Sequence, residues 1–151
     1  MKTLRFTLAL FALGLVGVLP ALAQKKPVSP HETITADIAG DKITLSYGRP
    51  YTKDPKTGEP RKIWGGLVPF GKVWRTGANE ATVLTTEKPL IFGATTIPAG
   101  SYSLWTIPEA DGSAKLVFNK QTGQWGTKHD AAQDFATVDL KKSSVSGLLN
   151  Q

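Results

Sequence analysis

The chain has 151 residues, with fifteen glycines, ten prolines, no cysteine and a formal net charge of +6 at pH 7. The lack of cysteine excludes a disulfide framework, a thiolate metal ligand and a lipid-modified cysteine. The length suits one domain with its own core and is too short for two domains of ordinary size.

Residues 1–23 have the three-part form of a secretory signal. Lys2 and Arg5 make a basic start, an apolar run covers residues 8–19, and a small-x-small cleavage site ends at Ala23. The apolar run is shorter than the roughly 20 residues of a membrane-spanning helix and is followed by a proline. We therefore expect cleavage after Ala23, a periplasmic or secreted location, and no stable membrane insertion of the mature chain.

Removal of the signal lowers the formal charge from +6 to +4, which is a mild basic balance. We expect no nucleic-acid partner outside the cytoplasm. Residues 49–75 carry seven basic side chains against Asp54 and Glu59, so this segment has a local charge of +5. Such a segment suits either contact with an anionic envelope component or a solvated loop kept soluble by its lysines, and we favour the loop.

Residues 24–30 (QKKPVSP) have two prolines and no periodic apolar pattern, which predicts a flexible leader. A single domain, residues 31–151, follows it. Apolar side chains recur at every second position over 34–38 and 43–47, around a turn at 39–41, and this pattern predicts a hairpin. The polar segment TKDPKTGEP after it predicts exposed turns.

The segment 101–107 (SYSLWTI) carries Tyr102 and Leu104 on one face and Trp105 and Ile107 on the other. A strand with both faces covered is typical of the centre of a fold. A turn at Asp111-Gly112 then leads to a strand over residues 114–118, and we expect the two strands to pair.

The remaining predicted elements are strands over 81–86, 90–92 and 138–140 and one helical turn within 130–135. Seven or eight short strands, with no long amphipathic helix to cover parallel crossovers, predict an all-β fold. We expect an antiparallel β-sandwich or a partly closed barrel.

Most enzyme signatures are missing from the sequence. It has no P-loop, no GxGxxG fingerprint, no GxSxG elbow and no HExxH motif. His31 and His129 lie far apart and are expected to be surface or loop residues, so we expect no metal and no cofactor. Glycosidase chemistry needs two carboxylates about 5 to 9.5 Å apart. Glu80 is one candidate, and the sequence does not nominate a second.

The segment 65–82, GGLVPFGKVWRTGANEAT, concentrates polar and aromatic residues between glycines. One interpretation is structural: the chain bends back so that Glu80 forms a bidentate pair with Arg75, while Asn79 bonds to the backbone of the turn. The second interpretation is a pocket whose aromatic faces and forked donors hold a sugar or a carboxylate. The candidate ligand-binding residues are Trp74, Arg75, Asn79, Glu80, Tyr47 and Arg49.

Four segments of the chain resemble a known family. They are ITLSYGRP (43–50), RKIWGGLVPFGKVWRTGANEAT (61–82), IPAGSYSLWTIP (97–108) and FNKQTGQWG (118–126). In this order they are similar to the bacterial domain-of-unknown-function family 2911, over about residues 29–140. The resemblance implies a shared fold and an exported protein, and it carries over no catalytic residue. Members continue into further β-rich sequence, so it also implies a truncated carboxyl terminus and an uncovered sheet edge.

Three hypotheses about function follow. The leading one is an exported, non-catalytic β-domain that binds a small polar ligand, a glycan or a cell-envelope partner. The second is a hydrolase that uses Glu80 as acid or base. The third is a structural accessory protein of the envelope, in which the 65–82 segment only supports the fold.

Overall fold

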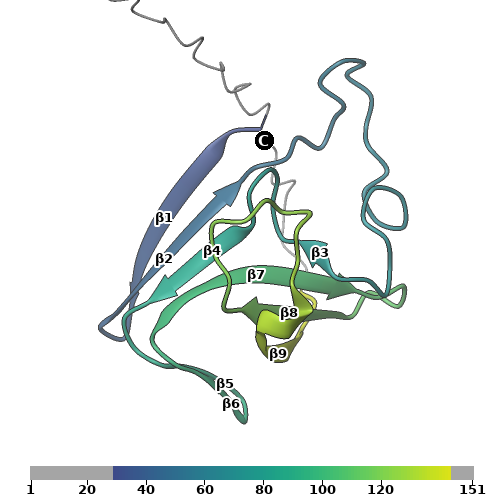
Figure 1. The fold of residues 1–151 in the computed structure, drawn as a ribbon. Helices are drawn as coiled ribbons and strands as arrows, with labels where there is room; N and C mark the ends of the chain where they lie inside the picture. Colours follow the sequence, from purple (N-terminus) through teal and green to yellow (C-terminus); the bar gives the residue numbers. More distant parts are fainter. Residues whose placement is uncertain (1–28, 144–151) are drawn as a thin grey trace, which may run out of the picture.

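The computed structural model of the protein describes residues 29–143. Within this range, all regular structure is β-strand except for one 3₁₀ turn, and most strands join one antiparallel sheet (Figure 1). The expected all-β fold class is confirmed. The predicted signal sequence, most of the predicted leader, and the chain end where truncation is expected lie outside the described residues.

The larger sheet has seven strands in the order β1-β2-β4-β7-β8-β9, with β3 paired to β7 beside this path, and β5 and β6 form a separate hairpin. The two-residue β3 and the three-residue β6 are the strands that the sequence pattern did not predict. The bounds are β1 His31–Ile38, β2 Asp41–Gly48, β3 Trp74–Arg75, β4 Thr82–Thr86, β5 Leu90–Phe92, β6 Thr95–Ile97, β7 Gly100–Pro108, β8 Ala114–Asn119, η1 Ala131–Gln133 and β9 Asp134–Leu140.

The predicted hairpin is formed by β1 and β2. Its turn places Ala39 (φ 54°) and Gly40 (φ 74°) in the left-handed region. Two consecutive residues of this conformation match the right-handed twist of the flanking strands. Ile34 and Ile38 remain 48% and 59% exposed on β1, which is an edge strand of the sheet.

Strand β7 is the centre of the fold, as its sequence predicts. It pairs with β4 and then β3 along one edge and with β8 along the other. Tyr102 and Leu104 pack into one core with the fully buried Phe118, while Trp105 packs into a second core on the opposite face with Val117. Full burial of a large apolar side chain stabilises the fold by about 1.5–3 kcal/mol. The two cores therefore fix the position of β7 and of the strands that pair with it, β3, β4 and β8.

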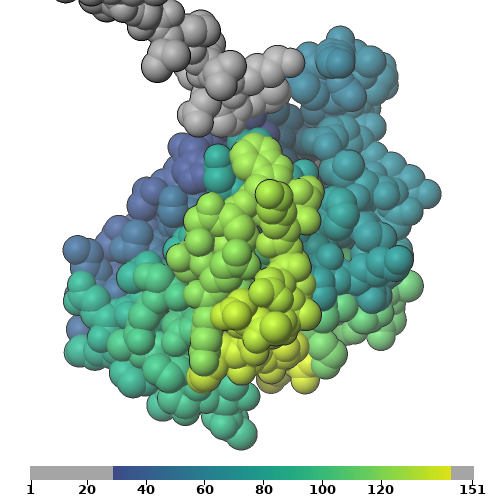
Figure 2. All heavy atoms as spheres, viewed as in Figure 1, coloured from purple at the N-terminus to yellow at the C-terminus, as the bar shows by residue number. Residues whose placement is uncertain are grey.

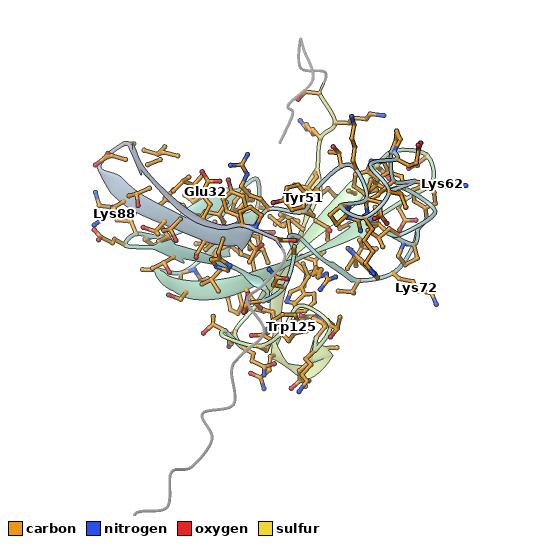
Figure 3. All side chains as sticks on the ribbon, turned by 90° about the horizontal axis from the view of Figure 1, so that it is seen from above. Glu32, Tyr51, Lys62, Lys72, Lys88 and Trp125 are labelled. Atoms are coloured by element: carbon orange, nitrogen blue, oxygen red, sulfur yellow. The ribbon has the colours of Figure 1, made fainter. Side chains whose placement is uncertain are left out.

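Two loops extend from this sheet toward the same region. The first, residues 49–73, connects β2 to β3 and projects beside the sheet; we call it the lobe (Figures 1 and 2). Figure 3 shows Lys62 and Lys72 on the outer side of the lobe and Tyr51 at its root. The second loop, residues 120–130, runs across a face of the sheet between β8 and β9, in yellow-green in Figure 2. The exposed turns predicted for residues 52–60 lie in the lobe.

Candidate functional site

The bend between β3 and β4, residues 76–81, lies against the end of β2. The Ala78 N–H donates to the carbonyl of Gly48 over 2.9 Å. A Cβ built on Gly48 would lie 2.1 Å from the Ala78 carbonyl oxygen, and one on Gly77 would lie 2.7 Å from Oγ1 of Thr82. Only glycine permits backbones to approach so closely. The glycines of the YGRP and WRTGAN segments are thus explained by the contact between those segments.

The loop 120–130 holds the same bend from the other side. The Gly126 N–H donates to the Asn79 carbonyl over 2.8 Å, and the Ala81 N–H donates to the Gln124 carbonyl over 3.0 Å. A Cβ on Gly126 would lie 2.6 Å from Cδ of Arg75. The bend, the end of β2 and the loop 120–130 are distant in the sequence and meet here. Each of them contributes a glycine at the contact.

The Arg75–Glu80 ion pair that the sequence suggested does not form within residues 29–143. Instead, Oε2 of Glu80 lies 3.7 Å from Nδ1 of His31 on β1. The guanidinium of Arg75 lies 6.0 Å from the ring centroid of Trp74, at the outer range of a cation–π contact. Arg75 and Glu80 do not form an ion pair, because Arg75 is held in β3 against Gly126 while the bend directs Glu80 toward β1.

Asn79 has a structural role in addition to any role in binding. Its backbone is left-handed, with φ 64°, a conformation that Asn tolerates better than most residues. Its Nδ2 donates to the carbonyl of Ser29 over 3.3 Å. The side chain thus ties the start of the described chain to the bend, rather than bonding within the turn as predicted.

Tyr47 and Arg49 belong to a different cluster, centred on Glu32 of β1. The Tyr47 hydroxyl donates to Oε2 of Glu32 over 3.1 Å, and Nη1 of Arg49 lies 3.0 Å from the same oxygen. Partial burial, and then the hydrogen bond to Glu32, raise the pKa of the Tyr47 phenol above its ordinary value. Neither residue lines the cavity described next, so the structure separates them from Trp74, Arg75 and Asn79.

A cavity of about 440 Å³ lies between the lobe and the β3 strand with its bend. Trp74, Arg75 and Asn79 line it, as the pocket interpretation expects, and Glu80, Tyr47 and Arg49 do not. Several lobe residues also line it, among them three aromatic or cationic residues that are not among the predicted site residues, two of which lie in the RKIWGG part of the resembling segment. These are Tyr51, Arg61 and Trp64.

Aromatic and cationic side chains line this cavity, beside aliphatic ones such as Ile63, Leu67 and Val68. Three aromatic rings and two guanidinium groups border it, and its lining residues include no Asp or Glu. Nη1 of Arg61 donates to the Tyr51 carbonyl over 3.0 Å, which fixes that side chain within the lobe. Arg75 forms no ion pair or side-chain hydrogen bond within the described residues. An unneutralised guanidinium beside aromatic faces favours a ligand that is rich in oxygen acceptors.

A cavity of similar volume, about 450 Å³, lies on another side of Trp64. Its lining is mainly apolar, with Phe70, Pro108 and Leu140, and its charged members are Glu109, Lys141 and Lys142. Arg61, Arg75 and Asn79 are not part of it. The 440 Å³ cavity is therefore the better candidate for polar recognition.

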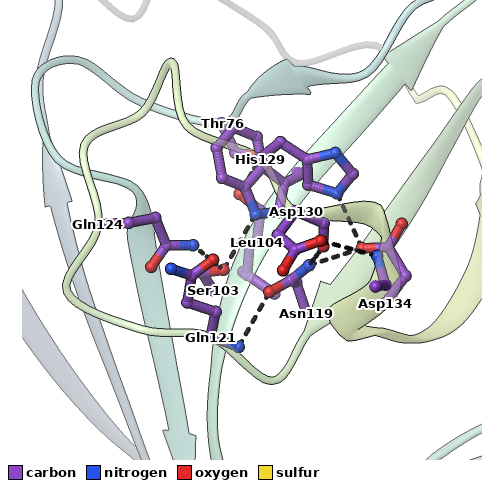
Figure 4. Close-up of polar contacts among 11 residues, drawn as sticks. Thr76, Ser103, Leu104, Asn119, Gln121, Gln124, His129, Asp130 and Asp134 are labelled. Carbon is purple, nitrogen blue, oxygen red and sulfur yellow. Dashed lines mark hydrogen bonds and ion pairs between the residues drawn. The ribbon is translucent and has the colours of Figure 1, made fainter.

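Beneath the bend, buried polar side chains form a hydrogen-bonded group (Figure 4). The hydroxyl oxygen of Ser103, a fully buried residue of β7, accepts from Nε1 of Trp105 and from Nε2 of Gln124, each over 2.9 Å. Buried polar groups are costly unless they are paired, so this arrangement orients the Trp105 ring as well as the loop that carries Gln124.

A second hydrogen-bonded group, partly exposed, holds His129. Oδ1 of Asp134 lies 2.8 Å from Nε2 of His129 and also accepts from Nδ2 of Asn119 over 2.8 Å. The imidazole packs on Trp105, with ring centroids 4.8 Å apart. His129 is a loop residue, as predicted, but its side chain is only 17% exposed and is held in one orientation. The sequence gives no signal for this, because the ring partner Trp105 comes from a distant strand, although Asp134 is only five residues away.

Two searches of the described part of the chain give negative results. Within residues 29–143, no group of three or more His, Cys, Asp or Glu side chains could hold a metal ion. No helix in the same range is long and apolar enough to cross a membrane.

The fold and the cavity define a class of protein: a cysteine-free antiparallel β-sandwich with a cationic, aromatic-lined cavity beside a projecting lobe. The chain belongs to the family described as "Protein of unknown function (DUF2911)", whose sequence model matches residues 29–150. No curated protein and no solved structure matches the chain. The resemblance seen in the four sequence segments is therefore confirmed, and a function has to be argued from the site itself.

Proposed function

We propose that this protein is an exported, non-catalytic domain that binds a small polar ligand, most simply a saccharide, in the 440 Å³ cavity. The observation that carries the proposal is the composition of the lining, which combines three aromatic rings, two arginines and an asparagine with no carboxylate. The volume falls within the range of about 300–1,000 Å³ that is usual for small-molecule sites.

The aromatic side chains come from two separate walls. Tyr51 and Trp64 belong to the lobe, and Trp74 belongs to β3. Trp64 is 62% exposed, which is unusual for so large an apolar ring without a partner. The apolar face of a sugar ring can stack on such rings while its hydroxyl groups remain in reach of polar side chains.

The polar side chains supply the complementary donors and acceptors. Arg61 and Arg75 offer forked N–H donors to hydroxyl or carboxylate oxygens. One N–H of the Asn79 amide donates to Ser29, which leaves its second N–H as a donor and its Oδ1 as an acceptor for ligand hydroxyls. The absence of a carboxylate from the lining also disfavours two-carboxylate hydrolysis at this place, which weakens the alternative based on Glu80.

The export part of the proposal is supported by the sequence of residues 1–23, which has the basic, apolar and small-residue regions of a secretory signal. Glycans and other polar envelope components are plentiful outside the cytoplasm. An exported domain with a saccharide-sized cavity would meet such ligands directly.

A glycan array, followed by thermal-shift measurements on the mature chain (residues 24–151), tests the proposal. Trp74→Ala and Arg75→Ala should each abolish binding of every wild-type hit. Trp125→Ala and Arg49→Ala are matched controls, because they remove the same residue types from outside the lining and should leave binding unchanged. Hits that survive both cavity variants would place the binding site elsewhere.

A second candidate partner is favoured by the outer surface of the lobe. Lys53, Lys56, Lys62 and Lys72 are all exposed there. These charges suit contact with an anionic envelope component, whose binding would weaken steeply as salt rises. Replacing the four lysines by glutamine should abolish this contact and leave saccharide binding intact, whereas unchanged binding to acidic polymers would exclude the lobe as their contact surface.

A further inference from the structure

A smaller cavity, of about 170 Å³, lies beside Arg75 and His129. Arg75 of β3 pairs directly with Trp105 of β7, so the two side chains share one face of the sheet. Trp74 and Arg75 border both this cavity and the larger one, whereas Trp105 and His129 border only the smaller. Its complete lining is Val73, Trp74, Arg75, Trp105, Gly126, Thr127 and His129.

His129 lines the cavity, and one of its two ring nitrogens is bonded within the protein. Its Nε2 is bound to Oδ1 of Asp134 at 2.8 Å, as Figure 4 shows. Because a carboxylate oxygen is an acceptor, the neutral imidazole carries its proton on Nε2 and keeps a lone pair on Nδ1. Within residues 29–143, Nδ1 has no hydrogen-bond partner. His129 is therefore an oriented acceptor for an O–H group.

Arg75 supplies the positive charge. Its aliphatic stem lies so close to Gly126 that a Cβ there would come within 2.6 Å of Cδ and 3.1 Å of Cβ of Arg75. This contact restricts the side chain, while its guanidinium is not neutralised by any described residue. The planar fork of a guanidinium matches the two oxygens of a carboxylate better than it matches a single hydroxyl.

No carboxylate competes for that charge within the cavity. The lining residues contain no Asp or Glu. Asp134, the acidic residue bonded to His129, already accepts from Asn119 through the same Oδ1. Besides Gly126 and Thr127, the walls are formed by Val73 and the two tryptophans, which suit the carbon atoms of an organic acid more than an inorganic ion.

We propose that the smaller cavity binds a small hydroxy acid, with the carboxylate on the Arg75 guanidinium and the hydroxyl donating to Nδ1 of His129. Trp74 and Trp105 flank the carbon skeleton. Since one water occupies about 30 Å³ of liquid, the cavity has room for a few non-hydrogen atoms and not for a polymer. The site is separate from saccharide binding in the larger cavity, although Arg75 borders both.

The test compares lactate with propionate, which differ by one hydroxyl group, and adds inorganic phosphate as a third probe. Nitrogen NMR spectra of the mature chain report the indole N–H of Trp105 and the ring nitrogens of His129. Lactate should shift both sets of signals saturably. Propionate should bind about tenfold more weakly, because it lacks the donor to Nδ1.

The variants separate the two contacts. Arg75→Lys, which keeps the charge and loses the fork, should weaken lactate and propionate together. His129→Phe should remove the preference for lactate while leaving propionate affinity near its original value. Lys128→Met takes one charge from the same loop outside the lining and should change nothing. Well-dispersed amide signals in the nitrogen NMR spectrum of each variant confirm that the variant folds.

Trp64→Ala distinguishes this proposal from the proposed function. Trp64 borders the larger cavity and not the smaller, so its loss should weaken saccharide binding and leave lactate binding unchanged. Absence of lactate-induced shifts at Trp105 and His129, or equal affinity for lactate and propionate, would overturn the hydroxy-acid site. Phosphate binding as tight as lactate binding would also overturn it, because the site would then be a general oxyanion site.

Discussion

Gly126 packs directly on Arg75, with room for a hydrogen atom and not for a methyl group. A Cβ at position 126 would lie 2.6 Å from Cδ of Arg75 and 2.7 Å from the Asn79 carbonyl oxygen. One of these atoms belongs to the backbone, so the strain cannot be relieved by a side-chain rotation alone. This contact holds the loop 120–130 against β3 and restricts the arginine that borders both cavities.

Gly126→Ala should therefore reduce stability by about 1–3 kcal/mol, the usual cost of inserting a carbon atom into a packed contact. It should also displace Arg75 and weaken ligand binding. Urea denaturation of the mature chain measures the first effect and thermal shift with a bound ligand the second. Gly123→Asn is the control, because that position has open space and a left-handed φ of 80° that Asn tolerates. Wild-type stability of Gly126→Ala would show that the contact is looser than described.

Features with a local origin were predictable from the sequence. The hairpin of β1 and β2 follows from alternating side chains and a Gly-containing turn, and the central place of β7 follows from apolar residues on both of its faces. These patterns depend on residues close together in the chain. The 3₁₀ turn after Asp130 has a similar local cause, since the Asp130 side chain accepts from the Ala132 N–H.

The site could be predicted only in part, because its construction is non-local. Trp74, Arg75 and Asn79 stand close together among glycines, which makes them predictable, whereas nothing local indicates that Tyr51, Arg61 and Trp64 of the lobe lie opposite them. The local spacing of Arg75 and Glu80 suggested an ion pair, yet the partner of Glu80 is His31 on β1. His129 and Asp134 are close in sequence, but the packing of Trp105 on the imidazole depends on β7.

Asp41 should be among the most sensitive polar residues of the fold. It is 6% exposed, and its carboxylate accepts from the Thr86 hydroxyl over 2.7 Å and from the N–H groups of Glu87 and Lys88 over 3.1 and 2.9 Å. Hydrogen bonds to charged groups contribute about 1.5–3 kcal/mol each, with incomplete additivity. Asp41→Ala should therefore lower the free energy of unfolding by about 3 kcal/mol in urea denaturation. Asp37→Ala, which removes one exposed hydrogen bond to Gly40, should cost less than about 1 kcal/mol.

Two aspartates in turns, Asp54 and Asp111, should make the folded protein less stable as the pH falls. Hydrogen bonds from the Lys56 N–H lower the pKa of Asp54, and those from the Ser113 side chain and N–H lower the pKa of Asp111. A carboxyl group with a lowered folded-state pKa stabilises the fold above its unfolded pKa of about 3.9, and this contribution is lost as the pH falls through the folded-state value. The Asp54→Asn, Asp111→Asn double variant should lose less stability than wild type between about pH 5 and pH 2. Urea denaturation measures the free energy of unfolding at each pH. An equal loss in wild type and the double variant would show that these two aspartates do not cause the decline.

Arg75 and Glu80 should be energetically independent, because Glu80 faces His31 and the guanidinium lies near Trp74. A double-mutant cycle with Arg75→Met and Glu80→Gln, measured by urea denaturation, should give a coupling energy of less than about 0.5 kcal/mol. Glu80→Gln alone should have a small effect, since Glu80 and its partner His31 are 42% and 44% exposed. The same cycle with His31→Gln and Glu80→Gln should show the larger coupling energy.

If Arg75 were instead the buried partner of Glu80, breaking the pair would cost about 3–5 kcal/mol. A loss of that size would return the arginine to a structural role and remove the donor on which both proposed sites depend.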